Sequence, residues 1–261
     1  MNSAVAMPVD VKLMNMTAAA LLIAFVVGGA WAMARWAVRL PAFDIKGISV
    51  SGDVSHNNNM TLRANVAPRL QGTFFSVDLA RVKAAFEAVP WVRRAVVRRV
   101  FPDSLQVVLQ EHQAVAYWGG EGELRLINSY GEVFEANVGE VESEMLPQLD
   151  GPEGVAADVL AMYRVVSPLF AEMELPVTRL ELTRGGSWRA QLDTNASIEL
   201  GRGTGDEVAA RVRRFLRTLV QVSSRYERRT NAVESADLRY ENGYAIRLRG
   251  VSTVVADSLK K

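Results

Sequence analysis

The longest apolar stretch of the chain lies near its N-terminus, where residues 13–34 include no charged side chain. A helix needs about 20 mostly apolar residues to cross the hydrocarbon core of a bilayer, and this stretch is long enough. Because backbone groups in lipid must be satisfied internally, a single span has to be helical. Trp31 and Trp36 stand near its end, where tryptophan favours the membrane interface. The pattern predicts a transmembrane helix over residues 13–36, after a short head of residues 1–12.

The same pattern is also typical of a cleavable signal peptide. Ala32-Met33-Ala34 has the small-x-small form of a cleavage site, and Gly28-Gly29 stands just before it. Against cleavage, the apolar stretch is longer than a usual signal core, and interfacial tryptophans suit a permanent anchor. We therefore expect the helix to be retained, with a cleaved soluble product as the alternative.

The charges that flank the predicted span bear on its orientation. Lys12 and the free amine, offset by Asp10, precede it, whereas Arg35, Arg39 and Lys46 follow it. By the positive-inside rule these charges lean toward a cytoplasmic C-terminal part. Large domains are translocated largely regardless of such charges, so the local charges do not decide the orientation.

Strand and helix patterns alternate over residues 43–113. Asp78 is a candidate N-cap for a helix that Pro90 ends. In chain order, the pattern predicts a strand at Phe43–Val50, a helix at Thr61–Leu70, the helix after Asp78, and strands at Val92–Val100 and Leu105–Glu111. This β-α-α-β-β order can close two helices over one face of a small sheet.

Residues 114–250 combine short strands with two longer amphipathic helices. Apolar side chains recur at helical spacing over Val155–Phe170 and from Asp206 to about Ser224. Strands are predicted at Leu124–Ile127, Glu132–Phe134, Val177–Leu182, Trp188–Leu192 and Ser197–Leu200. We expect an antiparallel β domain with helices, followed by a tail of residues 251–261, and an α+β fold for the whole chain.

The last predicted hairpin places a strand at the edge of this sheet. Asn242-Gly243, a strong signal for a two-residue turn, separates Ala236–Glu241 from Tyr244–Arg249. An edge strand carries unpaired N–H and C=O groups that are either protected or used to recruit a partner strand. Arg247 and Arg249 are equally consistent with guarding the edge and with docking a partner.

Candidate catalytic and metal-binding residues are few. The chain has no cysteine and only two histidines, so it lacks a thiol nucleophile and a common zinc site. His56 falls in a polar loop, where an exposed ring is expected, and His112 follows Glu111 at a strand end. No pair of carboxylates stands out for a hydrolase that cuts cell-wall sugars. We expect no catalysis and no cofactor.

Basic and glycine-rich segments suggest no nucleic-acid or phosphate site. The formal net charge of +1 gives no overall attraction to polyanions. Gly201–Gly205 precedes a helix but lacks the Lys-Ser/Thr of a phosphate-binding loop, so a capped turn is expected. The arginines of the helix from Asp206 onward have no stacking aromatics between them, which indicates a solvated face.

Several blocks of the sequence resemble the FtsQ/DivIB family over nearly the whole chain. The first group resembles the POTRA module of that family and includes Phe74–Leu79, Val89–Ala95, Val97–Arg99, Phe101–Leu105, Glu111-His112 and Ala116–Trp118. The second group comprises Asn128–Phe134, Leu146–Leu149, Leu200–Gly203 and Asp237–Tyr240. The combined set of blocks is more specific than any one of them.

The resemblance implies a non-catalytic, single-pass inner-membrane protein that acts as a scaffold at the division septum. Its POTRA and β domains would lie in the periplasm. The expected partners are FtsB and FtsL, with FtsK, FtsW and FtsI among the other division proteins. The alternative to this scaffold is a cleaved, soluble periplasmic module that binds peptides or acts as a chaperone.

In the family, FtsB adds a strand to the last β strand, which agrees with the edge expected from the hairpin. Carried over to this sequence, the resemblance implies that Arg239 pairs with a carboxylate of FtsB and that Tyr240 is an anchor. The remaining contact residues would be Asn242, Gly243, Tyr244, Ala245, Ile246, Arg247 and Leu248.

The chain departs from the family pattern at two places. Gly185-Gly186 replaces a partner-contacting arginine ahead of Ser187-Trp188, with Arg184 as the neighbouring basic residue. Leu248 stands where a tryptophan can occur in the family.

Overall fold

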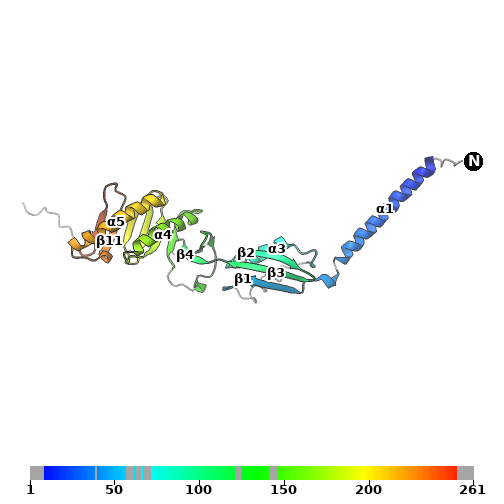
Figure 1. Ribbon diagram of the computed structural model, residues 1–261, viewed down its shortest axis with the longest axis horizontal. Helices are drawn as coiled ribbons and strands as arrows, with labels where there is room; N and C mark the ends of the chain where they lie inside the picture. The colour runs from blue at the N-terminus through cyan, green and yellow to red at the C-terminus, as the bar shows by residue number, and fades with distance from the viewer. Residues whose placement is uncertain are drawn as a thin grey trace, which may run out of the picture. The chain divides into compact units, whose positions relative to one another are not determined.

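The structure is a computed structural model that describes residues 9–38, 40–56, 62, 66, 72–120, 125–141 and 146–251. Contacts divide the chain into two compact units, Met1–Glu111 and His112–Lys261, which are described in turn. The chain runs from blue to red in Figure 1. Most of the predicted head and the tail after residue 251 lie outside the described residues.

Helix α1, Val9–Ala37, contains the predicted membrane span (Figure 1). Its segment Leu13–Ala37 is long and apolar enough to cross a bilayer. Large apolar side chains such as Leu21 and Phe25 are exposed along it, so the rest of the described unit does not cover them. An apolar helix of this length that the rest of the unit leaves uncovered fits a membrane anchor.

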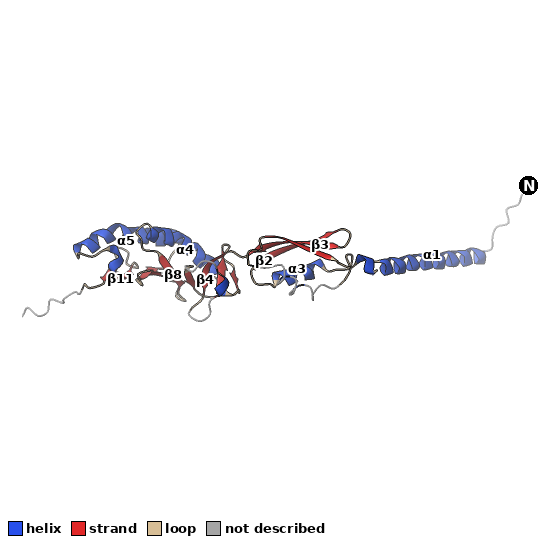
Figure 2. Cartoon of the chain, turned by 90° about the horizontal axis from the view of Figure 1, so that it is seen from below, coloured by secondary structure: helices blue, strands red, loops and turns tan. Residues whose placement is uncertain are grey.

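The rest of the N-terminal unit is a three-stranded sheet with a helix against it (Figure 2). Its elements are a 3-10 turn at Pro41–Phe43, β1 (Gly47–Gly52), α3 (Leu79–Glu87), β2 (Val92–Val100) and β3 (Ser104–Glu111). The strand order is β1-β3-β2, with β1 parallel and β2 antiparallel to β3. The side chain of Asp78 accepts hydrogen bonds from the amides of Ala80 and Arg81, which confirms the predicted N-cap.

The first predicted strand starts later than expected, and the first predicted helix is described only in part. The first strand begins at Gly47 rather than Phe43, because the chain makes a 3-10 turn from Pro41, whose fixed φ suits a first helical position. Within the predicted helix Thr61–Leu70, Leu62 and Val66 are helical and buried in the core, and its other residues lie outside those described.

His56 is not the exposed ring that its polar loop predicted. Its ring stacks on Trp91 with 4.0 Å between centroids and an angle of 9° between the planes. Its backbone amide donates to Oε2 of Glu111 at 3.0 Å, and its Nδ1 lies 3.2 Å from the same oxygen. A long-range contact with the buried end of β3 therefore holds His56 in place, and local polarity could not reveal it.

The C-terminal unit contains a nine-stranded sheet within the described residues, covered by two helices. The helices are α4 (Ala156–Ala171) and α5 (Gly205–Arg225), with 3-10 turns at Val138–Glu140 and Thr230–Ala232. The strands are β4 (Ala114–Trp118), β5 (Arg125–Asn128), β6 (Val133–Phe134), β7 (Gln148–Asp150), β8 (Val177–Leu182), β9 (Trp188–Leu192), β10 (Ser197–Gly201), β11 (Val233–Asp237) and β12 (Ala245–Leu248). Their order in the sheet is β12-β11-β10-β9-β8-β7-β4-β5-β6.

The fold class is α+β as expected, but the sheet is mixed rather than antiparallel. Three neighbouring pairs are parallel, namely β4 with β7, β7 with β8, and β10 with β11. Helix α4 connects β7 to β8, and α5 connects β10 to β11. A crossover through a helix returns the chain in the same direction, so each of these two helices makes a parallel neighbour.

Both helices pack on the same apolar layer of the sheet. Phe170 of α4 and Phe215 of α5 are almost fully buried in one core together with Leu180 and Ile198 of the strands. Along β9 the burial alternates, with Trp188, Ala190 and Leu192 buried. The alternation leaves the other face of the sheet to polar side chains.

The glycine-rich segment Gly201–Gly205 leads into α5, and its Thr204 is the N-cap of that helix. The side chain of Thr204 accepts from the amide of Glu207, whose carboxylate accepts from the amide of Thr204 at 2.8 Å. This capping box confirms the expected capped turn. The described residues also include no group of three or more acidic or histidine side chains placed to hold a metal ion.

Two neighbouring residues of α5 test the role of this core. Leu219 is fully buried, whereas Val220 is 49% exposed. We expect Leu219→Ala to lower the free energy of unfolding by about 2–5 kcal/mol, since it leaves a cavity. Val220→Ala, the matched control, is expected to change it by about 0.5 kcal/mol or less. Urea unfolding of the full chain in detergent, followed by tryptophan fluorescence, measures both, and equal losses would contradict the assignment of this helix face.

Candidate functional site

Strand β12 is the last strand of the nine-stranded sheet, as the sequence predicted. Within the described residues it pairs only with β11, in an antiparallel register that runs from Val233 opposite Leu248 to Asp237 opposite Ala245. The register shifts between Val233 and Ser235, which places one extra residue in β11. In the part of the chain that the structure describes, no strand covers the opposite side of β12, which is therefore an open edge.

The direction of each backbone group follows from one hydrogen bond next to the strand. The amide of Arg249 donates to the carbonyl of Ala232 at 2.8 Å, so it points toward β11. Backbone groups alternate from side to side along a strand, so those of Arg247 also point toward β11. Those of Ile246 and Leu248 point away from it. The Leu248 carbonyl accepts from the amide of Val251, which leaves the N–H and C=O of Ile246 and the N–H of Leu248 directed at the open edge.

The side chains of β12 separate into a buried and an exposed set. Leu248 is buried in the sheet core, and Ile246 packs against it. Ala245 and Arg247 are exposed, and the Arg247 side chain lies 3.8 Å from Glu234 at 70% exposure. The core thus holds the strand in place while its outer side chains remain accessible.

The hairpin exists, but its predicted two-residue turn at Asn242-Gly243 is wrong. Strand β11 ends at Asp237 and β12 begins at Ala245, so the connection covers residues 238–244. Tyr244 is therefore in the loop rather than in the strand. Its ring packs edge-on against Phe215 at 5.0 Å, and its hydroxyl lies 2.8 Å from Oγ1 of Thr218. These contacts with α5 lengthen the loop at the expense of the strand.

Helix α5 and strand β10 also contact the rest of this loop. The Arg214 side chain of α5 donates to the carbonyl of Glu241. The amide of buried Leu238 donates to the backbone carbonyl of Glu199 in β10 at 2.8 Å. In front, the loop and the start of β12 line an open hollow of about 640 Å³. Tyr240 is 57% exposed beside it. The lining residues are Tyr240, Glu241, Asn242, Gly243, Tyr244 and Ala245.

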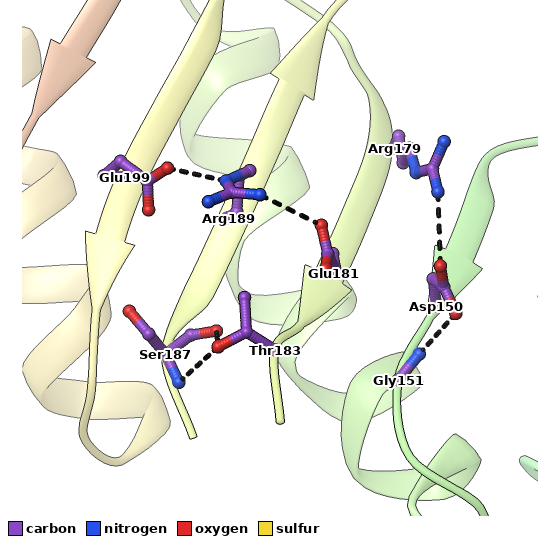
Figure 3. A network of polar contacts seen from close by, with 8 residues as sticks. All are labelled: Asp150, Gly151, Arg179, Glu181, Thr183, Ser187, Arg189 and Glu199. Carbon is purple, nitrogen blue, oxygen red and sulfur yellow. Dashed lines mark hydrogen bonds and ion pairs between the residues drawn. The ribbon is translucent and has the colours of Figure 1, made fainter. Parts of the chain in front are cut away.

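A row of charged residues crosses the polar face of the sheet toward this edge. Figure 3 shows Arg189 of β9 between Glu181 and Glu199, with Nε 2.6 Å from Glu199 and Nη1 3.5 Å from Glu181. The hydrogen bond to Glu199 raises the pKa of Arg189. In the sheet register Glu199 lies opposite Asp237, and Asp237 lies opposite Ala245. The row thus reaches β12 at an uncharged residue.

Arg239 ends this row in a bidentate ion pair with Asp237. Its Nε donates to Oδ1 at 2.9 Å and its Nη2 donates to Oδ2 at 2.6 Å. These hydrogen bonds lower the pKa of Asp237, against a smaller effect of burial, and raise the pKa of Arg239. The ion pair therefore persists at neutral pH and is lost as the pH falls through the lowered pKa of Asp237. A guanidinium has five N–H donors, so further donors remain on Arg239 for a second acceptor.

The predicted site residues thus lie next to one another in the loop and the edge strand, but the side chain of Leu248 is buried in the core and does not reach the surface. The departure at Gly185-Gly186 lies elsewhere, in the turn between β8 and β9, where Gly186 has a φ of +75° and Arg184 is exposed. Sequence reasoning missed Asp237 as the partner of Arg239. The available signal was that Asp237 and Arg239 carry opposite charges and stand two residues apart.

Comparison with known proteins agrees with this architecture. Residues 43–112 match the family model described as POTRA domain, FtsQ-type, and residues 116–239 match the model of Cell division protein FtsQ/DivIB, C-terminal. Three curated relatives each carry the name Cell division protein FtsQ. The relative from Thiomonas arsenitoxydans is 37% identical over 94% of this chain and 89% of its own length.

The other two relatives are similarly close over most of their length. The relative from Burkholderia pseudomallei is 39% identical over 93% of this chain and 94% of its own length. The relative from Bordetella pertussis is 35% identical over 92% of both. With an apolar N-terminal helix, a POTRA domain and the matching C-terminal domain in one order, the chain belongs to the FtsQ/DivIB family of cell division proteins.

Proposed function

We propose that this protein is a non-catalytic scaffold of the division machinery that captures an extended partner segment at the open edge of β12. The main support is the backbone of Ile246, whose N–H and C=O point away from β11. A partner strand would bond to these groups and continue the sheet. Its alternate side chains would face the exposed Ala245 and Arg247, and these contacts would give specificity.

A longer edge, at β2, is less suited to strand capture. Strand β2 is one of the two edges of the three-stranded sheet and is longer than β12. However, the Glu87 carboxylate of α3 accepts the Ala95 amide at 3.0 Å and so occupies a donor of that edge. Exposed arginines along β2, such as Arg94 and Arg98, also oppose strand addition. The open edge of β12 is the better candidate.

The family resemblance suggests FtsB, acting together with FtsL, as the partner that adds its strand here. Other partners from the resemblance are FtsK, FtsW and FtsI. In this proposal Tyr240 anchors the partner beside the hollow, and Arg239 offers its remaining donors to a partner carboxylate. Asn242 and Gly243 shape the loop between these contacts. Through these contacts the protein would connect early division proteins to septal wall synthesis.

The same proposal includes a single-pass topology in the inner membrane with the C-terminal part in the periplasm. The apolar helix α1 supports the anchor, and the family supports the side. The flanking charges argue for the opposite side, since more basic residues follow the helix than precede it.

Fusion reporters test this topology. We expect alkaline phosphatase fused after Lys261 to be active in cells, because that enzyme needs export, and a matched green fluorescent protein fusion to be dark. The measured mass of the membrane-extracted protein should equal that of a chain that retains residues 1–34. The reverse pair of reporter signals would place the domains in the cytoplasm, and loss of those residues would support the cleaved form.

Proline at Ile246 tests capture by the edge. Ile246→Pro removes an outward N–H without removing a donor to β11. We expect binding of the FtsB periplasmic segment to weaken about tenfold or more, because one hydrogen bond to the partner strand is lost and the proline ring blocks its approach. Ile246→Val keeps the amide and should bind nearly as wild type. Biolayer interferometry with the full chain in detergent measures both, with thermal unfolding as the check on folding. Equal binding of the two variants would refute strand addition.

Removal of charge separates the roles of the two arginines. We expect Arg239→Gln to weaken binding about two- to fivefold, as for an exposed ion pair. The loss should shrink as salt is added. Arg247→Gln, at a side chain of similar exposure, should weaken binding if Arg247 contacts the partner and should bind as wild type if Arg247 only guards the edge. Titrations at low and high salt measure this, and a salt-independent loss at Arg239 would exclude a direct ion pair with the partner.

A further inference from the structure

An aromatic cluster lies at one end of the POTRA domain and is not explained by capture at β12. Phe43 and Phe75 meet edge-on at 5.0 Å, Phe74 meets Phe75 at 5.2 Å, and Phe74 meets Phe101 at 6.1 Å. Phe74 is buried, whereas Phe75 is 48% and Phe101 is 75% exposed. Val100, next to Phe101, is also exposed. Contiguous exposed apolar side chains of this kind mark an interaction surface.

Hydrogen bonds join this cluster to the segment that leaves the membrane helix. Oγ1 of Thr73 donates to the carbonyl of Val38 at 2.7 Å, one residue after α1 ends. The amide of Phe74 donates to the carbonyl of Phe43, also at 2.7 Å. From Ala37 to Phe43 the chain can span at most about 20 Å. The cluster is therefore close to the end of α1 whatever direction the helix takes.

The turn between β2 and β3 belongs to the same end of the domain. The amide of Lys46 donates to the carbonyl of Asp103 at 2.9 Å, and the Lys46 side chain pairs with the Asp103 carboxylate at 3.3 Å. These contacts hold the turn that carries Phe101 beside the start of β1. Exposed Arg98 adds a basic side chain on β2.

We infer that this end of the POTRA domain inserts Phe75 and Phe101 into the surface of the bilayer that α1 crosses. Phenylalanine side chains gain from burial at the boundary between headgroups and acyl chains, and nearby basic side chains favour anionic lipid. The short tether keeps the two phenylalanines near the membrane, so little freedom is lost when they enter it. The contact would give the domain a second attachment to the bilayer. The inference depends on α1 as the anchor and not on strand capture, and it applies on either side of the membrane.

Cysteine reporters on β2 test the contact, because the chain has no cysteine of its own. Val100→Cys places a label next to Phe101 and keeps both phenylalanines. Arg94→Cys is the control, at an exposed site on the same face and about 20 Å along the strand. The full chain is reconstituted into vesicles of phosphatidylethanolamine and phosphatidylglycerol that carry lipids with a quencher near the headgroup.

We expect the label at residue 100 to be quenched at least threefold more strongly than the label at residue 94. Adding Phe75→Ser and Phe101→Ser to the Val100→Cys chain should remove most of that difference, while circular dichroism shows the fold intact. Equal quenching at the two sites, or quenching that survives the serine substitutions, overturns the inference. Binding of the FtsB segment should be unchanged by the serine variants, so this test fails or succeeds separately from strand capture.

Discussion

The burial of α4 and α5 on one face of the nine-stranded sheet is the constraint from which the rest of the C-terminal unit follows. Each helix must return the chain across that face, which produces parallel neighbours and sets the strand order. After α5 the chain adds β11 beside β10 and then β12 beside β11. Strand β12 thus becomes the edge, and Phe215 and Thr218 of the same helix hold the loop before it.

Hydrophobic periodicity predicted elements well where they are long and bury one face. The helices over residues 155–170 and 206–224, and both strands of the POTRA hairpin, are nearly as expected. The parallel pairings were missed because periodicity does not show which strands become neighbours. The turn at Asn242-Gly243 was missed because a tertiary contact of Tyr244 outweighs a local preference. The prediction that the ring of His56 is exposed was wrong for the same reason, since its partners lie far away in sequence.

For the candidate site, the sequence indicated the residues more readily than their chemistry. The edge position followed from a final hairpin, but the outward direction of the Ile246 amide required the hydrogen bond of Arg249. The pairing of Arg239 with Asp237 changes how that arginine meets a partner, since two of its donors are already used. The row from Glu181 to Asp237 likewise depends on strand register, which the sequence pattern left open.

The bond between Glu87 and the amide of Ala95 has a consequence for assembly. If the edges at β2 and β12 both accepted strands, one molecule could pair its β12 with β2 of the next, and copies would grow into an open fibre. A carboxylate placed over β2 opposes the first such pairing. If β12 captures a partner strand as proposed, protection of β2 would leave the edge at β12 free for the partner and would keep copies of the protein from joining end to end.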